Sequence, residues 1–429
     1  MAVNLAAPER LLPVAGVRLG VARAAIKEPC PAAPAAAAAD PARPAGATAP
    51  AADRDDLLLI ELAAGSQVAG QFTQNAFAAA PVLLCRQRLC AGVAVRGLLV
   101  NAGNANAATG DQGLVDAGAT TAAAAHSLGV PADTVLPLST GVIGRRLPVA
   151  RMLAAIPRAA MALRQDAWLP AARAMMTTDT VPKGASRRLE LGRRRLTVTG
   201  IAKGVGMICP DMATLLAFIA TDAPLTLAAT QRILRRAVAG SFNCATVDGD
   251  TSTNDACLLA ATGTAGGTPI DVDGAGFTEL AAAIEAVCVE LAQAIVRDGE
   301  GATRFVTLRV EGAADGAEAR RVAYAIARSP LVKTALFAGD ANWGRLIMAI
   351  GNAGVAGLDP RRVDLWLDQV ALLSAGQPDP GYREELGAAV VARPEFTIRV
   401  ALGRGGAAAR IWTCDFSYDY VRINAEYRS

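Results

Sequence analysis

The sequence predicts a layered α/β body, in which sheets and helices stack on one another as in an α/β or α+β fold. Short apolar segments with strand-like patterning alternate along its 429 residues with longer segments of helical spacing. Hydrophobic residues make up 52% of the chain and charged residues 19%, so a sizeable core can form. We therefore expect one large α/β body or two domains.

The first third of the chain predicts strands followed by a helix. Residues 8–27 show partly alternating apolar positions, and Leu57–Leu62 is a short apolar run. The segment 98–110 is expected to be a further strand that ends in a Gly/Asn-rich loop, and such a loop by itself is typical of an ordinary turn. The helix expected at 116–128 carries the single histidine, His126, in its last turn, where the helix dipole favours it and a structural role is expected.

An insert of different composition separates the first two of these strands. Residues 31–52 are mostly alanine and proline. Such a low-complexity segment cannot build a core, so we expect a dispensable surface loop rather than a domain linker.

The rest of the chain continues the alternation. Leu136–Leu138 leads into a tight Gly loop, and residues 150–174 have helical spacing that we expect Pro157 and Pro170 to interrupt. A hairpin is expected around Gly192, between strands at 187–191 and 193–198. The remaining elements predicted are a strand at 215–219, helices at 227–239 and 277–297, and strands at 305–310 and 396–402.

Composition argues against several function classes. The net charge of +3 is small, and no basic stripe with interleaved aromatics suggests nucleic-acid binding. No apolar run approaches the roughly 20 residues that span a bilayer, and no signal-peptide pattern opens the sequence, so we expect a cytoplasmic protein without membrane contact. The cysteines are scattered and are expected to be small buried hydrophobes: Cys30, Cys85, Cys90, Cys209, Cys244, Cys257, Cys288 and Cys414.

The segment from Lys203 to Asp222 carries the strongest chemical signal. It reads KGVGMICPDMATLLAFIATD, a glycine-rich loop that runs through a proline to Thr214 and an apolar run. With one histidine in the chain, a Ser-His or Cys-His couple has a single candidate base. A threonine freed by cleavage of the preceding bond can use its own α-amine, whose pKa of about 7.7–8.0 suits a general base. Without that loop, a threonine at the start of a strand is an ordinary β-former.

This segment closely resembles the self-cleavage site of the glutamate N-acetyltransferase / ornithine acetyltransferase family of arginine biosynthesis, whose pattern is approximately KGxGMIxPNMATML. Asp211 departs from it, because asparagine is usual there. The resemblance extends over essentially the whole chain outside the insert. Its further blocks lie at 101–110, 176–180, 247–255, 297–304, 331–337, 339–345 and 414–429.

The resemblance implies a self-processing acyltransferase of N-terminal-nucleophile-like architecture. Cleavage between Ala213 and Thr214 would give an α chain of residues 1–213 and a β chain of residues 214–429, which share one site and commonly assemble as an α2β2 heterotetramer. The activity implied is transfer of acetyl from N-acetylornithine to glutamate through an acetyl-threonine. Open alternatives are an N-terminal-threonine amidase or aminopeptidase, and a binding protein that has lost processing.

The resemblance also assigns the site, residue by residue. Thr214 is the nucleophile, and Thr140 and Gly141 form the oxyanion hole, although Ser-Thr-Gly could be a simple turn. The implied substrate-binding residues are Thr177, Lys203, Thr214, Glu300, Asn424 and Ser429. Lys203 could pair with a carboxylate, and Glu300 could receive an ammonium; the alternatives are a surface lysine and a solvated loop acid.

No cofactor is expected, although the sequence leaves open whether acetyl-CoA is a co-substrate. The segment 248–255 has oxygen-bearing side chains at alternate positions, which invites a metal interpretation. An EF-type loop starting at Asp248 would need glycine and glutamate where Thr253 and Leu259 stand, so no metal is expected.

Overall fold

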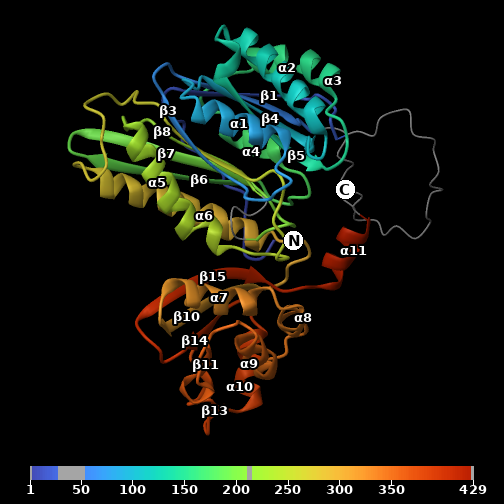
Figure 1. Cartoon of the computed structure of the whole chain (residues 1–429), viewed down its shortest axis with the longest axis vertical. Coiled ribbons are helices and arrows are strands. Elements are labelled where there is room, and N and C mark those ends of the chain that lie inside the picture. Colours follow the sequence, from blue (N-terminus) through green and yellow to red (C-terminus); the bar gives the residue numbers. More distant parts are fainter. Residues whose placement is uncertain (1, 28–53, 210–214, 427–429) are drawn as a thin grey trace, which may run out of the picture.

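The architecture is a stack of two β-sheets enclosed by helices, joined to a third sheet with helices of its own (Figure 1). The computed structural model describes residues 2–27, 54–209 and 215–426. The expected insert at 31–52 and the expected cleavage point lie outside these residues. The layered α/β architecture predicted from the sequence is confirmed.

The first sheet has the strand order β1-β2-β4-β5. Its strands are β1 (Val17–Ala22), β2 (Leu57–Leu62), β4 (Gly97–Asn104) and β5 (Val135–Val142). Neighbours run antiparallel except for the parallel pair β4–β5. Two helices, α2 (Gly110–Leu128) and α3 (Val149–Met161), cover its outer face. Because both faces are covered, alternate residues of β2 enter different cores, which explains its continuous apolar run.

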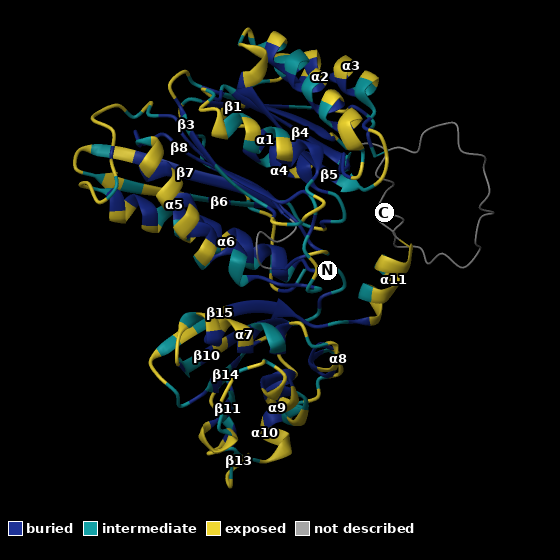
Figure 2. Cartoon of the chain, in the orientation of Figure 1, coloured by how far each residue is buried: buried dark blue, intermediate teal, exposed yellow. Residues whose placement is uncertain are grey.

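The second sheet has the strand order β3-β9-β8-β7-β6. Its strands are β3 (Gln67–Phe72), β6 (Lys183–Leu191), β7 (Arg194–Lys203), β8 (Leu216–Thr221) and β9 (Ala256–Ala261). Neighbours run antiparallel except for the parallel pair β8–β9. The helices α5 (Leu227–Gly240) and α6 (Phe277–Arg297) cover its outer face, and Figure 2 shows their solvent sides exposed.

A shared core joins the inner faces of these two sheets. The helix α4 (Trp168–Met175) lies between them and contacts strands of both. Its Trp168 is fully buried and stacks on Phe218 of β8, with 5.7 Å between ring centroids. The helix α1 (Ala80–Cys90) packs against β5 and β3. The layer order is therefore helix, sheet, sheet, helix.

The third sheet has the strand order β13-β12-β11-β14-β10-β15 and lies below the stack in Figure 1. Its strands are β10 (Phe305–Ala313), β11 (Asp364–Leu367), β12 (Val370–Ser374), β13 (Gln377–Pro378), β14 (Glu395–Ala401) and β15 (Ala407–Cys414). Its helices are α7 (Gly316–Ala327), α8 (Pro330–Ala338), α9 (Trp343–Gly351) and α10 (Glu384–Val391). The chain then forms α11 (Tyr418–Glu426). Short 3₁₀ helices are η2 (Ala132–Thr134), η3 (Phe242–Cys244) and η4 (Pro360–Arg362).

Most of the expected elements are present, with one clear error. The hairpin around Gly192 is β6–β7, and the glycine has a φ of +63°, which favours a residue without a side chain. The expected interruption at Pro157 is wrong, because α3 continues through it to Met161. Ile156 and Ala159 on either side are fully buried, and this packing outweighs the backbone hydrogen bond that proline cannot donate. Pro170 lies in the first turn of α4, where proline is tolerated.

The expected cleavage point falls, in the sequence, between β7 and β8. These antiparallel neighbours pair Lys203 with Leu216, so the loop between them leaves and re-enters the sheet at one place. The expected α and β chains would each supply one of these adjacent strands. The division into residues 1–213 and 214–429 stays a prediction.

Candidate active site

The oxyanion-hole candidates lie at the end of β5, beside its parallel neighbour β4. Gly141 has a φ of +132°, and a Cβ placed on it would lie 2.2 Å from the carbonyl carbon of Gly103. Only glycine fits this close approach of two strands. Thr140 is 6% exposed. The side-chain amide of Asn254 holds the end of β5 by donating to the carbonyl oxygen of Ser139 at 2.9 Å.

Lys203, the last residue of β7, reaches the hydroxyl of Thr140. Its Nζ donates to Thr140 Oγ1 at 3.2 Å and lies 3.9 Å from Asp179 Oδ2. Burial lowers the pKa of the Lys203 ammonium, and the negative charge of Asp179 opposes that change. Because Lys203 occupies a lone pair of the threonine oxygen, the hydroxyl hydrogen of Thr140 remains available to an oxyanion.

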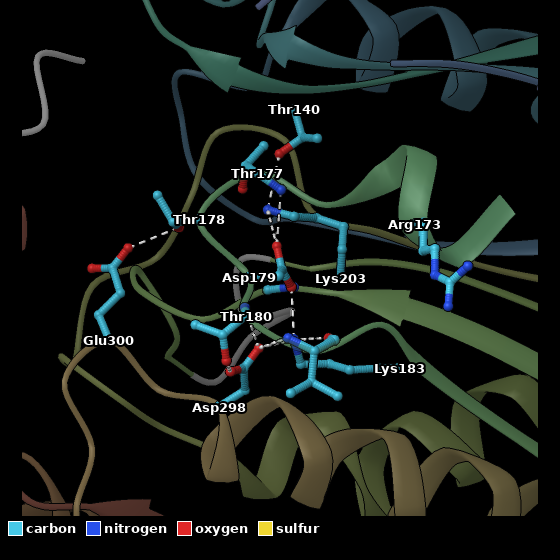
Figure 3. Close-up of polar contacts among 12 residues, drawn as sticks. Thr140, Arg173, Thr177, Thr178, Asp179, Thr180, Lys183, Lys203, Asp298 and Glu300 are labelled. Carbon is cyan, nitrogen blue, oxygen red and sulfur yellow. Dashed lines mark hydrogen bonds and ion pairs between the residues drawn. The ribbon is translucent and has the colours of Figure 1, made fainter. Parts of the chain in front are cut away.

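A buried ion cluster lies behind Lys203 (Figure 3). The side chains of Asp179 and Lys183 are 0% exposed, and Lys183 Nζ bridges Asp179 Oδ1 at 2.7 Å and Asp298 Oδ2 at 2.6 Å. Burial alone would raise the pKa of Asp179, but the charges of Lys183 and Lys203 outweigh it and hold that pKa below its ordinary value. Asp179 is therefore an anion that two lysines share.

Glu300 follows α6 and supplies a carboxylate to the same region. Its Oε1 accepts from Thr178 Oγ1 and its Oε2 from Asn424 Nδ2, both at 2.9 Å. A Cβ on Gly206 would lie 2.8 Å from this carboxylate, so the glycine loop after β7 gives it room. Figure 3 shows Glu300 on the Thr178 side of the cluster, apart from Lys203.

The segment 246–256 holds both described flanks of the expected cleavage loop. Asp248 Oδ1 accepts from the Ile208 N–H at 3.0 Å, and the Ile208 carbonyl accepts from the Val247 N–H at 2.9 Å. On the other flank, Asp255 Oδ1 accepts from the Leu215 N–H at 3.1 Å. Burial raises the pKa of Asp248 to about 6 and that of Asp255 well above its ordinary value.

These contacts give the acidic residues of 248–255 a structural explanation other than metal binding. Among residues 2–27, 54–209 and 215–426, no group of three or more His, Cys, Asp or Glu is placed to hold a metal ion. The oxygens of Asp248 and Asp255 bind backbone N–H groups instead.

The structure gathers most of the expected site residues around one cavity of about 230 Å³. The expected residues that line it are Thr140, Gly141, Thr177, Lys203, Glu300 and Asn424. Ala213, Thr214 and Ser429 lie outside the described residues, as does Asp211. The roles assigned to all of these residues stay predictions.

Sequence reasoning did not assign several residues of this region to the site. Thr178, Asp248, Ser252 and Asn254 also line the cavity, and Asp179 lies behind it. The blocks at 176–180 and 247–255 were the available signal, because both belong to the family resemblance. What they could not reveal is which of their side chains face the cavity.

Other expectations have mixed outcomes. His126 is exposed in the last turn of α2 and does not line the cavity. Of the described cysteines, the expectation of burial is confirmed for Cys85, Cys209, Cys257, Cys288 and Cys414. It is wrong for Cys90, which is exposed, and for Cys244, which is half-buried. In the described part of the chain, no helix combines the length and apolar character that crossing a membrane requires.

Comparison with known proteins identifies the family. A model of the ArgJ family matches residues 43–429. The arginine biosynthesis bifunctional protein ArgJ of Methylococcus capsulatus is 54% identical over 420 residues, which cover 98% of this chain and 97% of that protein.

Two solved structures are also similar to this chain. The crystal structure of the arginine biosynthesis bifunctional protein from Bacillus halodurans is 39% identical, covers 49% of this chain and 98% of its own, and has a TM-score of 0.47. The ornithine acetyltransferase of Mycobacterium tuberculosis complexed with ornithine is 30% identical, covers 48% and 96%, and has a TM-score of 0.35. On the family match and the full-length relative, this chain belongs to the ArgJ family.

Proposed function

We propose that this chain transfers the acetyl group of N-acetylornithine to glutamate through an acetyl ester on Thr214, releasing ornithine and N-acetylglutamate. As a member of the ArgJ family, the chain is an acetyltransferase of arginine biosynthesis. The residue roles, the processing, the α2β2 assembly, the cytoplasmic location and the use of acetyl-CoA belong to the proposal.

One observation carries the assignment of the site. A single cavity is lined by a buried ammonium on Lys203, a carboxylate on Glu300 and the Thr140–Gly141 pair, which come from separate parts of the chain. An amino-acid substrate with a carboxylate and an ammonium meets a partner of opposite charge for each. The hydroxyl of Thr140 and the backbone of Gly141, in the wall of the same cavity, are suited to a developing oxyanion.

The proposed activation is cleavage of the Ala213–Thr214 bond. Thr214 Oγ attacks the Ala213 carbonyl carbon, the C–N bond breaks as the nitrogen takes a proton, and water hydrolyses the resulting ester. Residue 213 is left with a carboxylate and Thr214 with an α-amine. The hydrogen bonds that fix Ile208 and Leu215 support this step, because they restrain the loop at both described ends.

The proposed transfer then uses the same two atoms twice. The α-amine of Thr214 accepts the Oγ proton as Oγ attacks the acetyl carbonyl, and it returns that proton to the departing ornithine nitrogen. The α-amine of glutamate then attacks the ester carbonyl, its proton passes to the Thr214 amine, and the Oγ leaving group takes it up. Each tetrahedral intermediate places its oxyanion at Thr140 and Gly141.

The test combines intact mass with acetyl transfer. Purified protein should contain two chains that meet between residues 213 and 214, and Thr214→Ala should remain one inactive chain. Varying N-acetylornithine against glutamate should give parallel double-reciprocal lines, and assays with and without acetyl-CoA test that donor.

Three outcomes would contradict the proposal in different ways. An active enzyme that stays uncut would exclude Thr214 as an N-terminal nucleophile. Intersecting kinetic lines with no acetylated β chain would mean direct transfer in a ternary complex. Hydrolysis that is indifferent to glutamate would favour the amidase alternative.

A further inference from the structure

We propose that Asp179 is a positioning residue of the acetyl-transfer site, which holds Lys203 and Thr177 in place to receive the substrate's carboxylate. This inference rests on the proposed function. Asp179 does not itself line the cavity, so it acts through the two residues that do.

The hydrogen bonds of Asp179 reach both of these residues. Its Oδ2 accepts from the backbone N–H of Thr177 at 3.0 Å and lies 3.9 Å from Lys203 Nζ. Its Oδ1 accepts from the backbone N–H of Gly204 at 2.8 Å, directly after Lys203. One buried carboxylate therefore ties the end of β7 to the loop after α4 (Figure 3). Loss of any of these bonds would free a wall of the cavity.

Asp179 also controls the charge of Lys203. The charged or titratable groups that act on Lys203 are Asp179, Lys183, Glu300, Asp255 and, from the strand-end loop after β1, Lys27. Burial lowers the pKa of Lys203; among its neighbours Asp179 has the largest effect and raises it, whereas Lys183 lowers it further. Without Asp179, the buried amine would lose its proton at a lower pH and could no longer pair with a carboxylate.

Asp298 provides a matched control. Its side chain is as deeply buried, at 1% exposed, and its Oδ2 accepts from Lys183 Nζ at 2.6 Å. Its other partners are Thr180 and Val181. Both Asp179→Asn and Asp298→Asn therefore remove one carboxylate from Lys183, but only the former removes the partner of Lys203.

The experiment measures kcat and KM for both substrates from pH 6 to pH 9.5 in wild type, Asp179→Asn and Asp298→Asn. The alkaline limb of kcat/KM in Asp179→Asn should move down by about 1–3 pH units. Its loss relative to wild type should grow as pH rises, mainly in KM, and shrink towards pH 6. For Asp298→Asn the ratio to wild type should not change with pH.

A pH-independent ratio in Asp179→Asn, or the same shift in both variants, would overturn the inference. If Asp179→Asn does not fold, the double variant Lys183→Met/Asp179→Asn can replace it, because it removes the buried amine together with the carboxylate. The single variant Lys183→Met is then the control. The double variant should move the alkaline limb of kcat/KM to lower pH, whereas Lys183→Met alone should move it to higher pH. Failure of both Asp179 variants to fold, while Asp298→Asn folds, would give Asp179 a framework role only. A wild type without acetyl transfer would instead contradict the proposed function.

Discussion

Glu300→Gln removes a negative charge from the cavity while keeping the shape of the side chain. The carboxylate accepts from Thr178 Oγ1 and Asn424 Nδ2, both at 2.9 Å. A glutamine can keep both contacts, because its oxygen still accepts from the asparagine amide and its NH2 can donate to the threonine hydroxyl. The Glu300 N–H to Val205 carbonyl bond is in the backbone and is unaffected. The variant therefore isolates the charge from the local structure.

The expected effect depends on the substrate. The side-chain ammonium of N-acetylornithine would lose a charge-assisted contact, worth about 1.5–3 kcal/mol. That corresponds to a decrease of about 10- to 150-fold in kcat/KM for N-acetylornithine. Glutamate has a carboxylate at the end of its side chain, so its kcat/KM should fall much less or rise.

The assay measures both half-reactions by varying one substrate against the other. Glu279→Gln is a suitable control, because it makes the same change at an exposed position at the opposite end of α6. It should leave both specificity constants within about twofold of wild type. Equal losses for the two substrates in Glu300→Gln would refute the role of Glu300 as the ammonium partner, and so would no loss at all.

Two further predictions follow from other parts of the site. Thr140→Ala should reduce kcat by about 100- to 1000-fold with little change in KM. The reason is that the Thr140 hydroxyl, which Lys203 holds in place, contacts the oxyanion only as the oxyanion forms. A loss confined to KM would contradict this role. Burial raises the pKa of Asp248 to about 6 from an unfolded value near 3.9, so the folded state binds the extra proton and wild-type stability falls as pH rises through this window. Asp248→Asn lacks this titration. In urea unfolding, the difference in free energy of unfolding between the variant and wild type should therefore change by about 2–3 kcal/mol in favour of the variant from pH 4 to pH 7.5. A difference that does not change with pH would contradict the raised pKa.

The sequence predicted the elements whose local pattern agreed with their tertiary surroundings. Leu57–Leu62 is β2 with the bounds expected, because both of its faces are buried and its whole length is apolar. Pro157 misled the prediction, because a local rule against proline in helices ignores the burial of its neighbours. The helices and strands around the third sheet were largely missed, since several are short and weakly patterned.

The same distinction between local pattern and tertiary contact applies to the site. Motif order by itself determined the family and singled out Thr140, Lys203 and Glu300 as candidates, because each is tied to a local block of sequence. Only the tertiary structure decided that these blocks meet in one cavity, and that Asp179 and Asp298 share a buried lysine. Asp179 is only four residues from Lys183, but Asp298 is 115 residues away, and local sequence does not encode which distant charge neutralises a buried one.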